Sequence, residues 1–253
     1  MIDLTPVMRF GLLLLRPGAL VAFAPGFGGT YAPAQTKIAL TVLLAMALVP
    51  GVPLPAIGDP VPLALVAVRE IALGFALALA VQAIVAGAEL GGHLAGFQMG
   101  LSYGATVDPQ SGVRNPLLAT LYGNLALVTF FMVGGHHAFL RALHQSYLDL
   151  PLSGGGAVGA SLPQVVAELL AVVFVLGARL AAPVVVVLVV VEIAMALVAR
   201  AAPAFNLMAV GAPLRLLAGL LLLPIVVPAL VALLSGAAGS IVQVAGRAAA
   251  AFR

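Results

Sequence analysis

The sequence predicts an all-α, polytopic membrane protein. Hydrophobic residues make up 63% of its 253 residues and charged residues only 8%, whereas a soluble domain has roughly a quarter charged residues. The mean hydropathy is +1.22. Apolar runs such as Pro183–Val191 are continuous, whereas barrel strands alternate polar and apolar residues. Because a membrane segment must satisfy its backbone hydrogen bonds internally, these runs predict helices.

Proline and glycine clusters bracket six apolar segments. Proline removes a backbone donor and glycine carries a backbone-entropy cost, so both residues tend to end helices. The expected helices are Val7–Phe23, Lys37–Val49, Pro62–Gly87, Pro116–Val133, Pro163–Ala201 and Leu207–Leu234. Residues 25–33, 50–62, 91–115, 134–163 and 203–204 are expected to connect them.

Three of these helices begin with a proline, at Pro62, Pro116 and Pro163, where the first turn of a helix tolerates it. The fifth segment has about 40 residues. At a rise of about 1.5 Å per residue, it is longer than a hydrocarbon core of about 30 Å. We therefore expect it to break, tilt or protrude, with a bend or a re-entrant hairpin near Arg179 and Pro183.

Ionisable residues lie within or beside the apolar segments. Each would cost about 2.5 to 3.5 kcal/mol if it faced lipid at the centre of the bilayer. We expect them to be paired, packed inward or buried between subunits. Those assigned to subunit packing are Arg69, Glu70, Glu89, Arg179, Glu192, Arg200 and Arg215. Arg16 and Glu168 lie in apolar segments as well.

The same charges allow a second interpretation. Intramembrane ionisable groups often form proton or substrate pathways, so Glu89, Arg179, Glu192 and Arg215 could serve a secondary transporter of a small solute. Such transporters usually show duplicated halves with broken helices in matching positions. Here only Ala24–Phe27 and Ala202–Phe205 are similar to each other, which is a short match. Solute transport is therefore the alternative function.

The segment Gly91–Gly112 is rich in glycine and mixes polar with bulky residues. Irregular backbone at membrane depth is tolerated only where it is buried in protein or lines a cavity. The segment could be a loop that enters and obstructs a pore, or an ordinary connector. Its composition leaves both interpretations open.

Catalytic and metal-binding patterns are weak. His136, His137 and His144, with Asp149 as a fourth ligand, do not have the spacing of a known metal motif, and a polar helix apex explains them as well. Ser102, Ser111 and Ser146 lack a nucleophile-elbow context. The net charge of +3 is scattered, whereas nucleic-acid binding needs clustered positive charge. We expect no enzyme activity, no cofactor and no nucleic-acid partner.

Several blocks of the sequence resemble the FliR family of the flagellar type III protein-export gate, which has counterparts in injectisomes. The blocks occur in the order of the family and span nearly the whole chain. They are Gly96–Tyr103, Val107–Gly112, Gly135–His137 with Leu140 and Leu143, Ser146–Tyr147, Leu150–Pro151, Ala199–Asn206 and Gly211–Leu214.

The resemblance implies a structural and gating role. FliR-like proteins assemble as one copy with FliP and FliQ into a closed helical pore for unfolded flagellar subunits, and they cooperate with FlhA and FlhB. It implies a FliP-like part at 1–160, a FliQ-like hairpin at 161–253 and a location in the inner membrane at the flagellar basal body, in contact with lipid. The loop 97–115 would form the pore plug, with Phe97, Gln98, Met99, Gly100, Leu101, Ser102, Tyr103, Asp108, Pro109 and Gly112.

Overall fold

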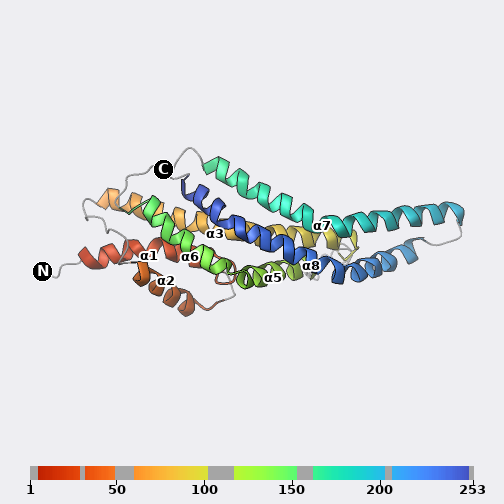
Figure 1. The fold of residues 1–253 in the computed structure, drawn as a ribbon, viewed down its shortest axis with the longest axis horizontal. Coiled ribbons are helices and arrows are strands. Elements are labelled where there is room, and N and C mark those ends of the chain that lie inside the picture. The colour runs from red at the N-terminus through yellow and green to blue at the C-terminus, as the bar shows by residue number, and fades with distance from the viewer. Residues whose placement is uncertain are drawn as a thin grey trace, which may run out of the picture. The chain divides into compact units, whose positions relative to one another are not determined.

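The chain is all-helical throughout the part that the structure describes. The computed structural model describes residues 5–28, 32–48, 60–101, 117–152, 162–202 and 207–250, and these contain no β-strand (Figure 1). Its helices are α1 (Thr5–Phe23), α2 (Ala34–Leu48), α3 (Pro60–Gln98), α5 (Leu117–Met132), α6 (Gly135–Asp149), α7 (Leu162–Ala201) and α8 (Leu207–Ala250). The predicted all-α class is confirmed.

Helix α3 is longer than its sequence predicts. The expected connector began at Gly91, but the helix continues to Gln98. Glycine in a helix interior costs roughly 0.8 to 1 kcal/mol relative to alanine, which is why the glycines suggested an earlier end. Gly91 and Gly92 instead lie where other elements come close, because an added Cβ at Gly91 would lie 2.8 Å from the Leu180 Cβ and one at Gly92 would meet the backbone of Leu118. The prediction of this boundary was wrong because packing outweighed local preference.

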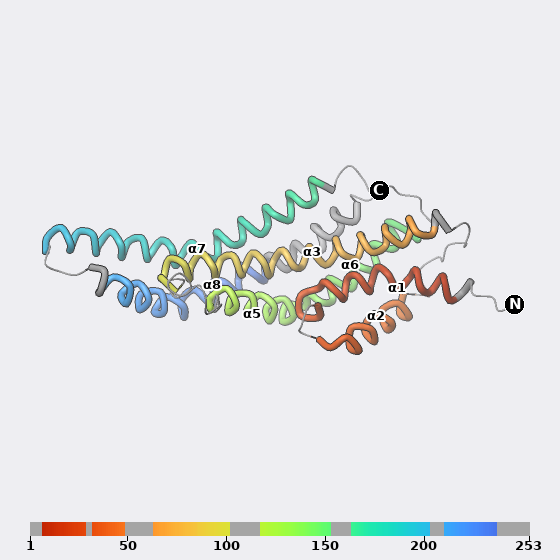
Figure 2. The backbone as a smooth tube through the Cα atoms, turned by 180° about the vertical axis from the view of Figure 1, so that it is seen from behind, coloured from red at the N-terminus to blue at the C-terminus, as the bar shows by residue number. Residues whose placement is uncertain are grey.

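Two further boundaries differ from the sequence prediction. The expected connector 134–163 contains the short helix α6. Polar and apolar residues are mixed in α6, so it has no continuous apolar run that would predict it. The last helix continues well beyond Leu234 to Ala250. Helix α7, in contrast, matches its expected bounds and keeps Pro183 in its interior. It forms no re-entrant hairpin, and its tube bends partway along without a break (Figure 2).

Three helices are long and apolar enough to cross a membrane, judged by length and composition among the described residues. These segments are Leu63–Gln98, Pro163–Ala201 and Val210–Gly236. The pair formed by α5 and α6, bent by 71° at its short break, would make a fourth if it counts as one broken span. In the most apolar window of each candidate, the buried share is 67% for Leu63–Gln98, 22% for Pro163–Ala201 and 17% for Val210–Gly236. Most of the last two windows is therefore exposed on this chain, so their apolar side chains face something outside it.

The chain divides into two compact units, each assembled from separate stretches. The first unit is Met1–Ala83, Phe130–Leu170 and Ala238–Arg253, and the second is Ile84–Thr129 and Ala171–Ala237. A division into contiguous parts at 1–160 and 161–253, with their FliP-like and FliQ-like character, stays a prediction. Within the first unit, the buried side chains of α1, α3 and α6 include Leu13, Leu20, Leu73, Leu77 and Leu143.

Candidate functional site

The base of the predicted plug is the carboxyl end of α3. The Gly100 amide donates to the Phe97 carbonyl and the Leu101 amide donates to the Gly96 carbonyl, both at 3.0 Å. Gly100 has φ +80°. This pair of bonds around a left-handed glycine is a Schellman motif, which satisfies carbonyls at a helix end. A side chain at position 100 would be strained in this conformation, so the motif gives Gly100 a specific structural role.

Met99 anchors this helix end in the second unit. Its side chain is 1% exposed and packs in a buried cluster with Ala95, Leu118, Val184, Leu188 and Val226. On α8, Gly219 leaves the space that Met99 occupies, because an added Cβ there would lie 2.6 Å from the Met99 Sδ and would also meet Cγ and Cε. Met99 therefore packs between helices, whereas the neighbouring Phe97 is 72% exposed and Leu101 is 37% exposed.

The start of α5 lies against the same end of α3. An added Cβ at Gly92 would meet the Leu118 carbonyl, and one at Gly96 would lie 3.7 Å from the Leu118 Cβ. The described chain thus stops at Leu101 and resumes at Leu117 with both ends held in the second unit. Of the predicted plug residues, Ser102, Tyr103, Asp108, Pro109 and Gly112 lie outside the described residues. Gln98 is the last residue of α3 and is half-buried.

Glycines bring α3 and α7 close together in the second unit. Gly87 and Gly91 are four residues apart on α3, and an added Cβ at either would press on Leu176 or Leu180 of α7. From the other side, an added Cβ at Gly177 would lie 2.9 Å from Leu90. Small residues four apart allow helices to approach closely where hydrophobic burial cannot drive their association. This contact fixes α3 about two and a half to three and a half turns before Gly100.

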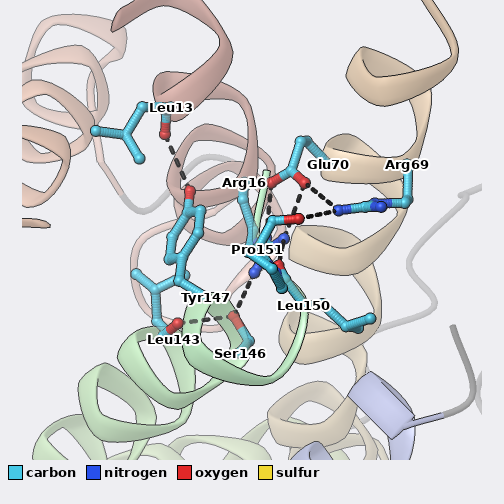
Figure 3. Close-up of polar contacts among 9 residues, drawn as sticks. All are labelled: Leu13, Arg16, Arg69, Glu70, Leu143, Ser146, Tyr147, Leu150 and Pro151. Carbon is cyan, nitrogen blue, oxygen red and sulfur yellow. Dashed lines mark hydrogen bonds and ion pairs between the residues drawn. The ribbon is translucent and has the colours of Figure 1, made fainter. Parts of the chain in front are cut away.

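A buried ion pair lies in the first unit. Arg16 of α1 and Glu70 of α3 are both fully buried, and Nε and Nη2 of Arg16 donate to the two carboxylate oxygens of Glu70 at 2.8 Å (Figure 3). Two parallel charge-assisted bonds of this kind are the strong form of an arginine–carboxylate contact. Desolvating two charges is costly, so such a pair persists only where further hydrogen bonds satisfy the remaining groups.

The end of α6 provides those further bonds. Arg16 Nη1 donates to the Ser146 Oγ at 2.9 Å, and Arg16 Nη2 donates to the Leu150 carbonyl at 3.0 Å. Arg69 Nη2 donates to the Pro151 carbonyl at 2.7 Å and lies 3.5 Å from a Glu70 oxygen (Figure 3). Cations at the carboxyl end of a helix are favoured by its dipole. The two arginines therefore fix the end of α6 to α1 and α3.

The other charged residues that were assigned to subunit packing are less buried than Arg69 and Glu70. Arg215 and Glu192 pair across the second unit at 3.3 Å, with side chains 31% and 36% exposed. Glu89 is half-buried beside Gly123, where an added Cβ would lie 2.9 Å from the Glu89 Oε1. Arg179 and Arg200 are exposed in this chain, so their burial would need another subunit. The assignment of these charges to subunit packing stays a prediction.

Sequence reasoning identified Arg16, Arg69 and Glu70 as charges within apolar segments but did not find their partners. The bonds of Arg16 join residues 54 and 130 to 134 positions apart, a separation that no local pattern reveals. Among the described residues, no group of three or more His, Cys, Asp and Glu side chains could hold a metal ion. The assembled features are thus a helix-end anchor and a structural ion pair.

The sequence of this chain is similar to those of known proteins over most of its length. Residues 7–240 match the family described as bacterial export proteins, family 1. Relatives named flagellar biosynthetic protein FliR include those of Escherichia coli strain K12, 31% identical over 85% of this chain and 82% of that protein, and Bacillus subtilis strain 168, 28% identical over 88% and 86%. The protein of that name from Caulobacter vibrioides is 30% identical over 84% and 85%. The chain therefore belongs to family 1 of the bacterial export proteins, the family of the flagellar proteins FliR.

Proposed function

We propose that this chain is a gating subunit of the flagellar protein-export channel. Its family makes it a component of a flagellar export apparatus, and its apolar helices make it a multi-pass membrane protein. In this role the chain forms a closed pore with FliP-type and FliQ-type subunits. Unfolded flagellar subunits are the export substrates that pass through the pore. FlhA-type and FlhB-type proteins would act with it at the basal body in the inner membrane.

One observation supports the gating role above the others. The segment that joins α3 to α5 leaves from a helix end that is capped at Gly100 and anchored by Met99, and it returns at Leu117 beside the same part of α3. A loop that is to block a channel reproducibly needs such a fixed base. Phe97 and Leu101, both exposed at this base, are the apolar side chains that would contribute to the seal.

Gating in this proposal involves no bond chemistry. The plug retains the ion barrier while no substrate is present, and an unfolded chain displaces it during export. Helix α3 is held by α7 through Gly87, Gly91 and Gly177, so in this proposal the base of the plug stays in place when the gate opens. The closed and open states would then differ mainly in residues 102–116.

The test is an ion-leak measurement in bacterial cells that carry the chain with its partner subunits. One variant lacks residues 102–112 and keeps Met99, Gly100 and Leu101, so that the end of α3 retains its cap. A matched control shortens another connector, residues 153–161. We expect a large leak from the first variant only. Normal assembly without a leak would refute the plug and leave the segment as a connector.

A further inference from the structure

Pro17 lies in the interior of α1. Proline has no backbone N–H, and its ring displaces the carbonyl four residues earlier. In α1 that carbonyl belongs to Leu13, which a regular helix would satisfy with the amide of residue 17. The helix alone therefore leaves the buried Leu13 carbonyl without its usual donor.

Tyr147 of α6 occupies the place of that donor. Its hydroxyl donates to the Leu13 carbonyl at 3.1 Å, across 134 residues of sequence (Figure 3). Both side chains are buried, with 1% exposure for Tyr147 and none for Leu13. Water therefore does not compete for this carbonyl, and the phenol replaces the hydrogen bond that Pro17 removes.

Neighbouring contacts hold the proline turn from two sides. On the α6 side, the Arg16 guanidinium lies over the Tyr147 ring at 4.0 Å from its centroid and donates to the Ser146 Oγ. On the α3 side, Gly74 lies so close that an added Cβ would meet the Arg16 carbonyl. The turn around Pro17 thus packs against α3 on one side and against α6 on the other.

We propose that the Tyr147 hydroxyl acts as a latch on α1. By donating to the Leu13 carbonyl, it closes the turn in which Pro17 removes a backbone hydrogen bond. While α6 is docked, the latch keeps α1 rigid through Pro17. When α6 moves away, the Leu13 carbonyl loses its donor and α1 can bend at this point. The latch couples the conformation of α1 to the docking of α6, and it does not depend on whether residues 102–116 form a plug.

A double-mutant cycle tests the latch. The full chain is purified in detergent from bacterial membranes, and amide hydrogen exchange is followed in α1 between residues 10 and 20. Tyr147→Phe keeps the ring and removes the donor, so we expect about tenfold faster exchange, the effect of one lost buried hydrogen bond. Pro17→Ala supplies an amide that can donate to the Leu13 carbonyl. On that background, Tyr147→Phe should change exchange by less than about twofold.

Tyr122 of α5 provides a matched control. It is as deeply buried as Tyr147, but its hydroxyl has no hydrogen-bond partner among the described residues. Tyr122→Phe should leave exchange in α1 unchanged. Equal acceleration by Tyr147→Phe on both backgrounds would overturn the latch, as would no acceleration on either. If Tyr147→Phe alone cannot be purified, the proposal still requires the double variant to be recovered as well as Pro17→Ala.

Discussion

Met99 occupies the space left by the missing side chain of Gly219. The two residues lie on α3 and α8 of the second unit, 120 positions apart in the sequence. Met99 also directly precedes Gly100, the left-handed glycine that caps the end of α3. The end of the helix that leads into the predicted plug is therefore positioned by a glycine of the last helix.

Gly219→Ala should destabilise the second unit. The new methyl group would meet Met99 at Cγ and Cε and lie 2.6 Å from Sδ, and overpacking of a core typically costs about 1 to 3 kcal/mol. The measurement is the thermal midpoint of the purified full chain. Gly236→Ala on the same helix is the control, because nothing lies within 4 Å of its added Cβ. Met99→Ala should partly rescue Gly219→Ala, and equal midpoints for the two glycine variants would contradict the assigned contact.

Glu70→Gln should strongly reduce the amount of folded protein in the membrane. The substitution keeps the shape but leaves the buried Arg16 without its counter-charge, and breaking a buried pair costs about 3 to 5 kcal/mol. Quantitative immunoblots of membrane fractions would measure the loss. Glu192→Gln removes the same charge from the part-exposed pair with Arg215, where a smaller loss is expected because neither side chain is fully buried in this chain. Similar losses in both variants would show that burial is not what matters.

Gly100→Ala should loosen the end of α3. Position 100 has φ +80°, a conformation that costs an L-residue about 1 to 2 kcal/mol. Amide exchange at Leu101 would report the loss of its bond to Gly96. Gly96→Ala is the comparison, since its added Cβ would find only ordinary contacts at 3.7 Å within a regular helix. Unchanged exchange in Gly100→Ala would mean that the motif does not hold this end.

Gly74→Ala should prevent α1 from packing on α3. The methyl group would meet the Arg16 carbonyl and lie 2.9 Å from the Ala19 Cβ, and backbone atoms cannot move aside as a flexible side chain can. Limited proteolysis of the full chain would detect the released α1. Gly11→Ala on α1 has nothing within 4 Å of its added Cβ and should leave the cleavage pattern unchanged. Protection of both variants alike would argue against a tight crossing at Gly74.

The sequence alone predicted the helical class and most helix starts, because long apolar runs and prolines are local signals. It failed at Gly91, where the glycine that suggested a helix end instead makes room for Leu180. It also missed that Arg16 pairs with Glu70 and Ser146, since long-range pairing leaves no periodic pattern. Residues 102–116 carry most of the predicted plug and lie outside the described residues. Their role stays a prediction.

The long separations within the Arg16 cluster impose an order on biosynthesis. Arg16 leaves the ribosome 54 residues before Glu70 and 134 residues before Leu150. At roughly 5 to 20 residues per second, its counter-charge emerges about 3 to 11 seconds later and its last acceptor about 7 to 27 seconds later. During that interval the nascent chain carries an unneutralised cation in its first apolar helix. The contacts of Arg16 can therefore form only after α3 and the end of α6 have been synthesised.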